Sequence, residues 1–229
     1  RAKLLAKGDF KPLVTHIPEA LAKMDYDQYR SIRFRPDASL WRNEAQFEVQ
    51  LFHAGFLFKE PVVLHMSGDA PLQFKQEFFN YDGKAAPLAG IAPKDIGFAG
   101  FRLHYPLNNN QYKDEFAVFQ GASYFRMVGP GQAYGLSARG LPVDTAEPKG
   151  EEFPVFREFW LLKPTPAEKH LVLYALMDSQ SITGAYRFDM YPGNPNQVKI
   201  TARVFARKDV NKVGFAPLTS MYLFGENCL

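Results

Sequence analysis

The residues best suited to chemistry lie in one stretch of the chain, between Gly121 and Trp160. This stretch holds six glycines, seven aromatic residues and nine charged residues, but only six Leu, Val or Met residues. An aromatic ring can stack on the apolar face of a sugar ring, and an arginine can hydrogen-bond to neighbouring hydroxyls. The composition therefore predicts a surface that contacts a ligand rather than a packed core.

Four side chains in this stretch are candidate ligand contacts. They alternate with glycine, serine and other small residues, which would let a ligand approach the backbone closely. They are Tyr124, Arg126, Tyr134 and Arg139. Trp160 offers a further stacking platform, although its apolar neighbours also suit a core position. The alternative interpretation is that the arginines and tyrosines form ion pairs and packing contacts that hold long loops in place.

The carboxylates Glu151 and Glu152 stand next to each other, just before Pro154. Two carboxylates on either side of a glycosidic bond can act as general acid and general base. Adjacent residues of an extended segment point to opposite faces, so this pair cannot flank one bond unless the chain is kinked there. We therefore consider them ligand contacts, with a solvated acidic turn or ion pairs to nearby arginines as the alternative.

Asp178 ends a long apolar run, at the kind of loop where β-sandwiches expose functional groups. A role in the turn itself is the alternative for this carboxylate. The chain has no Gly-x-Ser-x-Gly motif, and its one cysteine is Cys228, so a serine or cysteine nucleophile has no support. The glycine-rich segments lack the Gly-Lys-Ser/Thr ending of a phosphate-binding loop, and the five histidines are widely separated. We therefore expect no cofactor and no metal.

Charge and hydropathy exclude two classes of partner. The chain of 229 residues has 27 Lys and Arg against 24 Asp and Glu, and the basic residues are scattered. A nucleic-acid surface would be denser in positive charge, so no nucleic-acid partner is expected. No apolar stretch approaches the roughly 18 residues that a membrane-spanning helix needs. The protein is therefore not expected to span a membrane.

Hydrophobic periodicity indicates which elements position the candidate residues. Residues 1–33 have short helical patterns, with Asp25 or Asp27 as a capping residue. From Phe47 onward the period is two, which is typical of strands with one buried face. Strands are predicted at 47–52, 61–66, 98–105, 115–120, 156–162, 186–190 and 198–206, and a strand buried on both faces at 171–177. Many strands joined by short polar turns predict an all-β fold, an antiparallel sandwich or barrel.

Several sequence motifs together resemble the glucans biosynthesis protein G/D family, which serves the synthesis of osmoregulated periplasmic glucans. The resemblance runs in order from about Pro12 to Asn227. The motifs are Asp95–Arg102, Gly121–Arg126, Tyr134–Leu141, Gly150–Pro154 and Ala216–Met221. Weaker similarities at Arg33–Pro36 and Arg102–Leu107 favour the D branch of this family.

This resemblance implies a fold and a location. The fold is a large antiparallel β-sandwich of the galactose mutarotase-like supersandwich type, followed in the family by a small immunoglobulin-like domain. The location is the periplasm of a Gram-negative bacterium, after export. We expect residues 1–229 to form an incomplete N-terminal sandwich domain, with 1–33 as a helical arm and the second domain absent. The ending Cys228-Leu229 is interpreted as the scar of a truncation or frameshift.

The resemblance also implies a substrate, a β-1,2-linked glucan chain held in a long cleft. Members of the family are similar to glycoside hydrolases that cut this linkage with inversion, and their catalytic acids lie downstream of the motif matched by Thr219–Gly225. Catalytic residues are therefore unknown here and are expected beyond residue 229. Candidate glucan contacts within the chain are Tyr124, Arg126, Tyr134, Arg139, Glu151, Glu152, Trp160 and Asp178.

Three functions follow as alternatives. The first is a periplasmic protein that binds and cleaves or trims the β-1,2-glucan. The second is a non-catalytic scaffold that binds the glucan and assists a membrane glucan synthase. The third is epimerase-type chemistry, which would require His104 or His170, although kinship of fold alone is a weak argument for activity.

Overall fold

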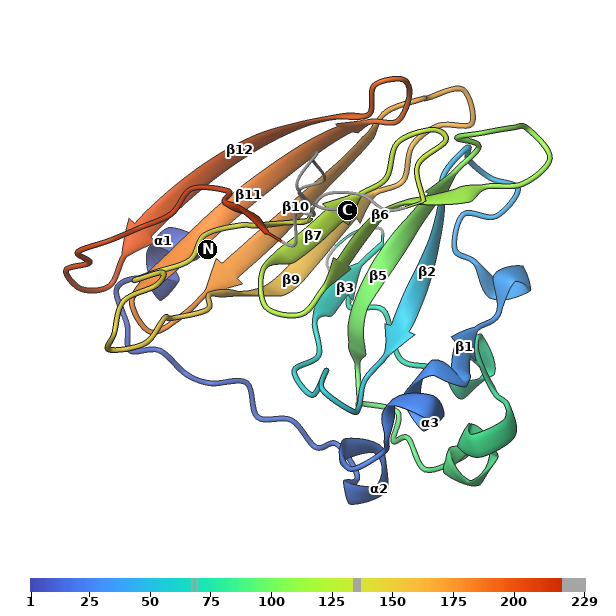
Figure 1. The fold of residues 1–229 in the computed structure, drawn as a ribbon, viewed down its shortest axis with the longest axis horizontal. Helices are drawn as coiled ribbons and strands as arrows, with labels where there is room; N and C mark the ends of the chain where they lie inside the picture. Colours follow the sequence, from blue (N-terminus) through green and yellow to red (C-terminus); the bar gives the residue numbers. More distant parts are fainter. Residues whose placement is uncertain (67, 69, 134–136, 220–229) are drawn as a thin grey trace, which may run out of the picture.

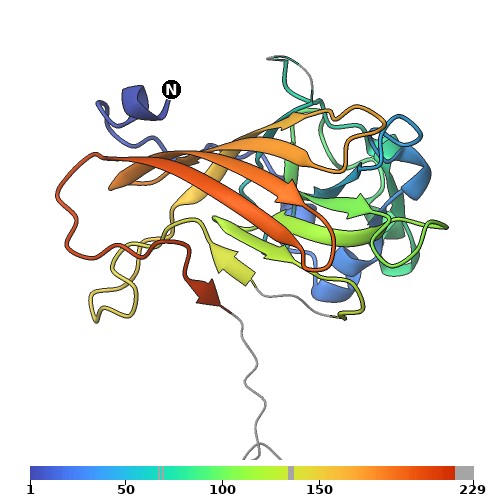
Figure 2. The same cartoon turned by 90° about the horizontal axis from the view of Figure 1, so that it is seen from above.

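Two β-sheets packed face to face make up the body of the protein (Figures 1 and 2). The structure is a computed structural model, and it describes residues 1–66, 68, 70–133 and 137–219. The sheet nearer the viewer in Figure 1, here called the front sheet, is entirely antiparallel and has the order β13-β8-β7-β6-β5-β2. Its strands are β2 (Glu48–His53), β5 (Phe98–Tyr105), β6 (Asp114–Gln120), β7 (Tyr124–Met127), β8 (Ser137–Arg139) and β13 (Leu218–Thr219).

The second sheet, here called the back sheet, has five strands in the order β12-β11-β10-β9-β3. They are β3 (Val63–His65), β9 (Val155–Leu162), β10 (Leu171–Asp178), β11 (Ile182–Tyr191) and β12 (Gln197–Ala206). All neighbours are antiparallel except β3 and β9, which run parallel. The predicted all-β sandwich is confirmed, with this one parallel pair added.

Phenylalanine rings from both sheets form the core between them. Phe101 of β5 and Phe119 of β6 are stacked with ring centres 5.0 Å apart. From the back sheet, the ring of Phe159 stands edge-on to Phe101 at 5.0 Å, and the ring of Phe188 stands edge-on to Phe119 at 5.3 Å. Each of these four residues is at most 2% exposed. Because every strand turns its alternate side chains inward, this contact leaves the other face of each sheet outside.

The N-terminal region lies around the sandwich rather than in it. It contains α1 (Ala2–Leu5), α2 (Glu19–Ala22) and α3 (Tyr26–Arg30), as the helical patterns predicted. Asp25 caps α3 in a reciprocal arrangement with Gln28, in which each side chain accepts the other residue's backbone N–H. Figure 2 shows α1 on the side of the back sheet away from the front sheet, where the Thr183 hydroxyl donates to the Ala2 carbonyl at 2.9 Å.

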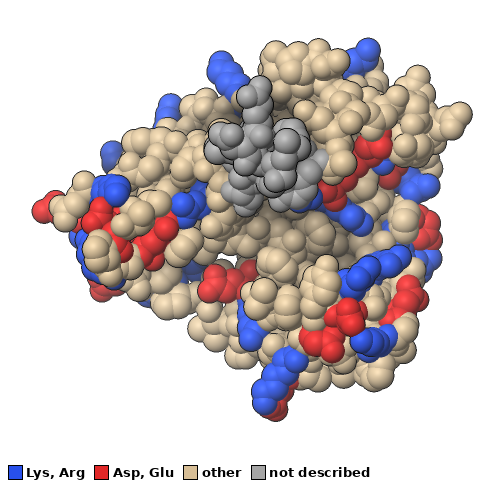
Figure 3. Space-filling view, in the orientation of Figure 1, with Lys and Arg blue, Asp and Glu red and all other residues tan. Residues whose placement is uncertain are grey.

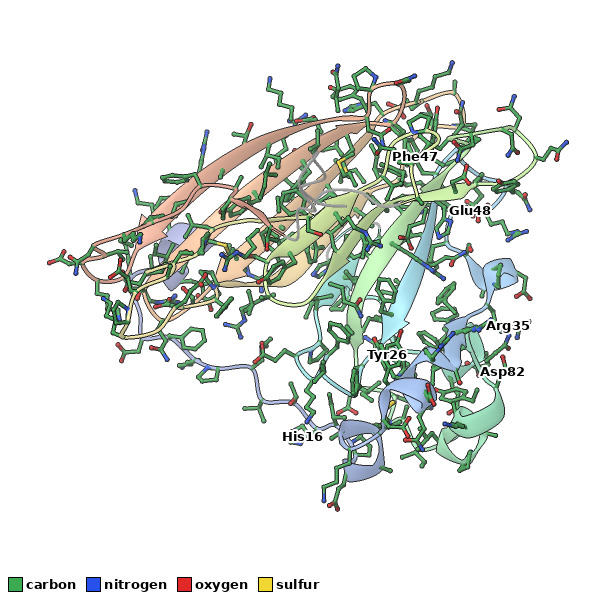
Figure 4. All side chains as sticks on the ribbon, in the orientation of Figure 1. His16, Tyr26, Arg35, Phe47, Glu48 and Asp82 are labelled. Carbon is green, nitrogen blue, oxygen red and sulfur yellow. The ribbon has the colours of Figure 1, made fainter. Side chains whose placement is uncertain are left out.

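A small third layer lies beside one end of β2. It consists of β1 (Ile32–Phe34) and β4 (Phe79–Tyr81), paired antiparallel, with 3-10 helices at 36–38, 76–78 and 83–88. Figure 4 places Tyr26, Arg35 and Asp82 in this part of the molecule, and Phe47 and Glu48 at the start of β2. The layer buries His53, whose ring contacts Phe74, Phe79 and Tyr81 edge-on.

The strand predictions are confirmed for the long strands and for the short strand β3, which was predicted at 61–66, whereas five other short strands were missed. The predicted strand at 98–105 is β5, and the other long predictions differ from the structure by one to four residues at their ends. The short strands β1, β4, β7, β8 and β13 were not predicted. Two to four residues are too few for alternation to stand out, because a period needs several repeats to be recognised.

Burial differs from the sequence-based predictions in three segments. The stretch 121–160 was predicted to be a contact surface and not core, yet Phe125, Phe156 and Phe159 are buried in the core. The strands of this stretch bury only one face, so a large apolar side chain is needed only at every second position. The run 171–177 was predicted to be buried on both faces, but Tyr174 is 37% exposed on the outer face of the back sheet. The apolar face of β12 is only half-buried or exposed, because β12 is the edge strand of its sheet.

Candidate functional site

Three of the predicted ligand contacts lie together on the outer face of the front sheet. Tyr124 and Arg126 are on β7, and Arg139 is on β8 directly opposite Tyr124. All three point away from the core because Phe125, between the first two, points into it. Figure 3 shows that this face of the molecule is hollowed near its centre and bordered by acidic and basic side chains.

A hollow of about 320 Å³ marks this face, and we call it the front hollow. Side chains from β2, β6, β7 and β8 and from the loop after β2 line it. They are Phe52, Phe58, Glu115, Val118, Gln120, Tyr124, Phe125, Arg126 and Ser137. Aromatic rings and hydrogen-bonding side chains therefore border the same open space.

Glu115 joins two arginines across the front sheet. Arg126 Nη2 donates to Glu115 Oε1 at 3.0 Å, and Arg102 Nη1 donates to Glu115 Oε2 at 3.4 Å. The guanidinium carbon of Arg102 also lies 5.7 Å from the centre of the Phe52 ring. The two arginine side chains are 31% exposed and that of Glu115 is 26% exposed. These contacts hold both guanidinium groups at the surface in fixed positions.

The sequence patterns did not predict Glu115, Arg102, Phe52 or Phe58 as site residues. For Phe52 the outward direction could have been predicted, because alternation along β2 turns its side chain to the same face as Glu48 and Gln50. For Glu115 no local pattern predicts an outward direction. The pairing of β5 with β6 shifts register between Leu103 and His104, so β6 has an extra residue at Phe116. This bulge is what turns Glu115 to the same face as Val118 and Gln120.

Arg139 connects the front hollow with a second concave region. Its guanidinium carbon lies 5.8 Å from the centre of the Tyr124 ring and 5.6 Å from that of Phe153. Its Nη1 forms an ion pair with Glu151 Oε1, which also accepts from the Thr145 hydroxyl at 3.3 Å. The alternative interpretation of Glu151 as an ion-pair partner of an arginine is therefore confirmed.

The second region, which we call the edge pocket, has a volume of about 360 Å³ and brings Glu151, Glu152 and Asp178 together. It lies where the loop before β9 meets the end of β10 and the N-terminal arm. Its lining residues are Phe10, Pro12, Leu13, Glu60, Glu151, Glu152, Phe153, Val155, Arg157, Asp178, Ser179 and Gln180. The two adjacent glutamates have different partners, as expected for neighbours on an extended segment.

Three carboxylates of the edge pocket, those of Glu151, Glu152 and Asp178, are engaged by the protein itself. Asp178 is 1% exposed and forms ion pairs with Arg157 and with Arg207, whose Nη1 lies 2.5 Å from Asp178 Oδ1. Glu152 accepts from the backbone N–H of Ser181 at 2.9 Å and from its hydroxyl at 2.6 Å. Burial alone would raise the pKa of Glu152, but hydrogen bonds from Ser179 and Ser181 outweigh it and lower the pKa. Glu152 is therefore ionised and suited to holding structure or ligand, not to donating a proton.

Trp160 does not belong to either hollow. It lies on the outer face of the back sheet, where its ring is stacked on His65 with ring centres 5.0 Å apart. His65 Nε2 lies 2.7 Å from Glu158 Oε1, and the guanidinium carbon of Arg1 lies 5.7 Å from the centre of the Trp160 ring. Trp160 thus faces away from Tyr124 and Arg126. Tyr134, the remaining predicted contact, lies outside the described residues.

The two histidines of the epimerase alternative lie on opposite sheets. His104 is on the outer face of the front sheet, with Nδ1 donating to the Lys113 carbonyl at 3.0 Å, and burial lowers its pKa. His170 is next to the back sheet, with its ring stacked on Tyr191 at 4.7 Å. The two cannot act on one ligand.

The described part of the chain contains neither a metal-ligand cluster nor a membrane-spanning helix. Among residues 1–66, 68, 70–133 and 137–219, no three His, Cys, Asp or Glu side chains are grouped so that they could hold a metal ion. Within the same residues, no helix has the length and hydropathy to cross a bilayer.

Comparison with known proteins identifies the family. A family model described as "Periplasmic glucan biosynthesis protein, MdoG" matches residues 1–228. The "Glucans biosynthesis protein G" of Bradyrhizobium diazoefficiens and that of Ralstonia nicotianae are each 46% identical to this chain. In both comparisons 99% of this chain and 45% of the relative are covered. The corresponding protein of Pectobacterium atrosepticum is also 46% identical, with 44% of its length covered.

The family resemblance inferred from the motifs is therefore confirmed. The chain spans a little under half the length of these curated relatives, 44–45%. With a match over residues 1–228 and identities of 46%, the chain belongs to the MdoG family of periplasmic glucan biosynthesis proteins.

Proposed function

We propose that this protein acts in the periplasm and binds a segment of a β-1,2-linked glucan in the front hollow. The observation that carries the proposal is the meeting of Tyr124, Arg126 and Glu115 around one open space of 320 Å³. The Tyr124 ring offers a stacking surface for a pyranose, and the arginine and glutamate supply donors and acceptors for hydroxyls. The family match provides the substrate class, since its name refers to glucan biosynthesis.

The proposal assigns binding, rather than acid–base chemistry, to the residues of these two hollows. A general acid of a glycosidase needs a raised pKa so that it holds its proton. The pKa of Glu152 is lowered, and Glu151 and Asp178 are tied to arginines. Cleavage or trimming of the glucan is therefore proposed for the whole protein, with its catalytic acids outside the front hollow and the edge pocket.

The alternative function is a glucan-binding scaffold that assists a membrane glucan synthase. The engaged carboxylates are as compatible with a scaffold as with a cleaving enzyme, because a scaffold needs the hollow for binding and needs no catalytic acid. The two functions differ in one measurable outcome, the appearance of shortened oligosaccharides.

The test uses the native full-length protein and linear β-1,2-glucan oligosaccharides. Tyr124→Ala and Arg126→Gln are each expected to raise the Kd measured by titration calorimetry roughly tenfold, the equivalent of about 1.4 kcal/mol. Arg33→Gln is the matched control, because Arg33 is an exposed arginine on the separate β1–β4 sheet. Unchanged affinity in both hollow variants would exclude the front hollow as the glucan site.

Chromatography of the same mixtures separates the two functions. Shorter products released by the wild-type protein support cleavage, whereas saturable binding with no shorter product supports the scaffold. A wild-type protein that neither binds nor cleaves the glucan would contradict both.

A further inference from the structure

The outer face of the back sheet has a hollow of its own, away from the two regions described above. Its volume is 620 Å³, and β10, β11 and β12 form its floor; we call it the back hollow. It is larger than the front hollow, at 320 Å³. The two hollows lie on opposite outer faces of the sandwich, so they cannot be parts of one continuous groove across a single sheet.

Two exposed tyrosines mark the back hollow. Tyr174 on β10 is 37% exposed and Tyr191 at the end of β11 is 44% exposed. Tyr174 lies directly opposite Arg187, four residues before Tyr191 on β11. Four residues along a strand and one step across it place the two tyrosines about 14 Å apart. A single pyranose is too small to contact both rings, so a saccharide that contacts both must contain several sugar units.

The space between the tyrosines is bordered by fixed hydrogen-bonding groups. Arg187 donates to Asp189 through Nε and Nη2 at 2.6–3.1 Å, and its guanidinium carbon lies 5.9 Å from the centre of the Tyr174 ring. The Arg187 and Asp189 contacts hold the pKa of Asp189 below its usual value, so the carboxylate stays an acceptor. On the far side, His170 is stacked on Tyr191 and restricts that ring. The surface is therefore ordered before any ligand arrives.

The next strand adds donors to the same space. Lys199 lies opposite Asp189 on β12, and Arg203 lies four residues further on. Neither side chain forms an ion pair or a side-chain hydrogen bond with any residue that the structure describes. Their N–H groups are available to oxygen atoms of a ligand.

The composition of the back hollow favours a saccharide over a protein or a lipid. Among the described residues, Ala185 is the one aliphatic side chain of the lining and four side chains are charged, whereas the centre of a protein interface is depleted in charge and membrane binding requires inserted apolar side chains. Separated aromatic rings with donors and acceptors between them match the apolar faces and hydroxyls that alternate along a sugar chain.

We propose that the back hollow is a second glucan-binding surface, in which Tyr174 and Tyr191 stack on sugar rings and Arg187, Asp189 and Lys199 bind the hydroxyls between them. The ligand class rests on the function proposed above, but the site does not depend on the front hollow. Two binding surfaces on one protein raise the affinity for a polymer long enough to reach both, because the second contact is then intramolecular.

The test uses the native full-length protein, and titration calorimetry with a long linear β-1,2-glucan as the probe. The double variant Tyr174→Ala/Tyr191→Ala is expected to raise the Kd roughly tenfold, while Tyr174→Phe/Tyr191→Phe, which keeps both rings, stays near the wild type. Tyr112→Ala is the matched control, since Tyr112 is a 58% exposed tyrosine outside both hollows. Thermal unfolding checks that the variants are folded, and Arg187→Gln provides a second variant that leaves both rings in place and is expected to weaken binding.

The outcomes separate this inference from the proposed function. Loss of affinity in the back-hollow variants, with or without an effect of Tyr124→Ala, supports the second surface. Wild-type affinity in the back-hollow variants, together with a loss in Tyr124→Ala, overturns the inference and leaves the proposed function intact. Absence of any glucan binding by the wild type overturns both. Binding of vesicles with anionic phospholipid that requires Tyr174 and Tyr191, without glucan binding, overturns it in favour of a membrane surface.

Discussion

The guanidinium carbon of Arg139 lies 5.8 Å from the centre of the Tyr124 ring, and the two residues are direct cross-strand partners on β8 and β7. The same guanidinium group forms the ion pair with Glu151, which lines the edge pocket. Arg139 is thus the side chain through which the front hollow and the edge pocket are connected. Its contacts also explain why Glu151, on a long loop, has a fixed position.

Replacing Arg139 tests this connection. Arg139→Ala is expected to lower the free energy of unfolding by about 1–3 kcal/mol, because Glu151 loses its charged partner while remaining mostly buried. Arg139→Lys keeps the charge but not the planar fork, so it should recover part of the loss. Urea denaturation measures both variants. Equal stability of wild type and Arg139→Ala would mean that the ion pair with Glu151 contributes nothing.

Removing the charge of Asp178 is expected to cost more. In Asp178→Asn, the Arg207 side chain, which is 6% exposed, and the Arg157 side chain both lose their ion pair with this carboxylate. Leaving a buried charge without its partner costs about 3–5 kcal/mol. The control is Asp37→Asn, which breaks the exposed ion pair with Arg35 and should destabilise the protein far less, because solvent screens an exposed pair. A similar small change in both variants would contradict the structural role of Asp178.

Gly100, in the middle of β5, should not tolerate a side chain. Its φ is +141°, and a Cβ atom there would lie 2.1 Å from the carbonyl oxygen of Phe119 on the neighbouring strand. Gly100→Ala is expected to destabilise the protein by about 3 kcal/mol or more. Gly8→Ala, where no atom lies within 4 Å of the added Cβ, should change stability by less than about 0.5 kcal/mol. Thermal unfolding of the two variants side by side provides the comparison.

His53 should make stability depend on pH. Burial lowers its pKa in the folded protein from 6.5 to about 4. Between these two values the unfolded chain binds more protons than the folded one, so the free energy of unfolding falls as the pH falls from 6.5 to 4. At pH 4.5 the loss from this residue is about 2–3 kcal/mol relative to pH 7.

The control for that prediction is His53→Gln, which keeps hydrogen-bonding capacity without titrating in this range. Its unfolding free energy, measured in urea at pH 7 and pH 4.5, should change by less than that of the wild type. An identical change in both proteins would show that other groups cause the acid sensitivity.

The sequence by itself determined the long strands and the class of fold. In β12, apolar residues alternate from Val198 to Ala206, long enough for the period of two to identify a strand. The motifs, read in order, determined the family. A spacing of two residues implies that Tyr124 and Arg126 share a face, but the strands β7 and β8 that turn them and Arg139 outward were not predicted.

Only the tertiary structure decided which candidates share a site. Trp160 is close to Arg139 in sequence, but β9 belongs to the back sheet and β8 to the front sheet, so the two side chains lie on opposite outer faces. Asp178 meets Arg207, 29 residues further on, through pairing that no local pattern encodes. Glu115 reaches the front hollow through a bulge that reverses the alternation of β6. Strand order and register depend on contacts between distant segments, and the sequence of one segment does not contain them.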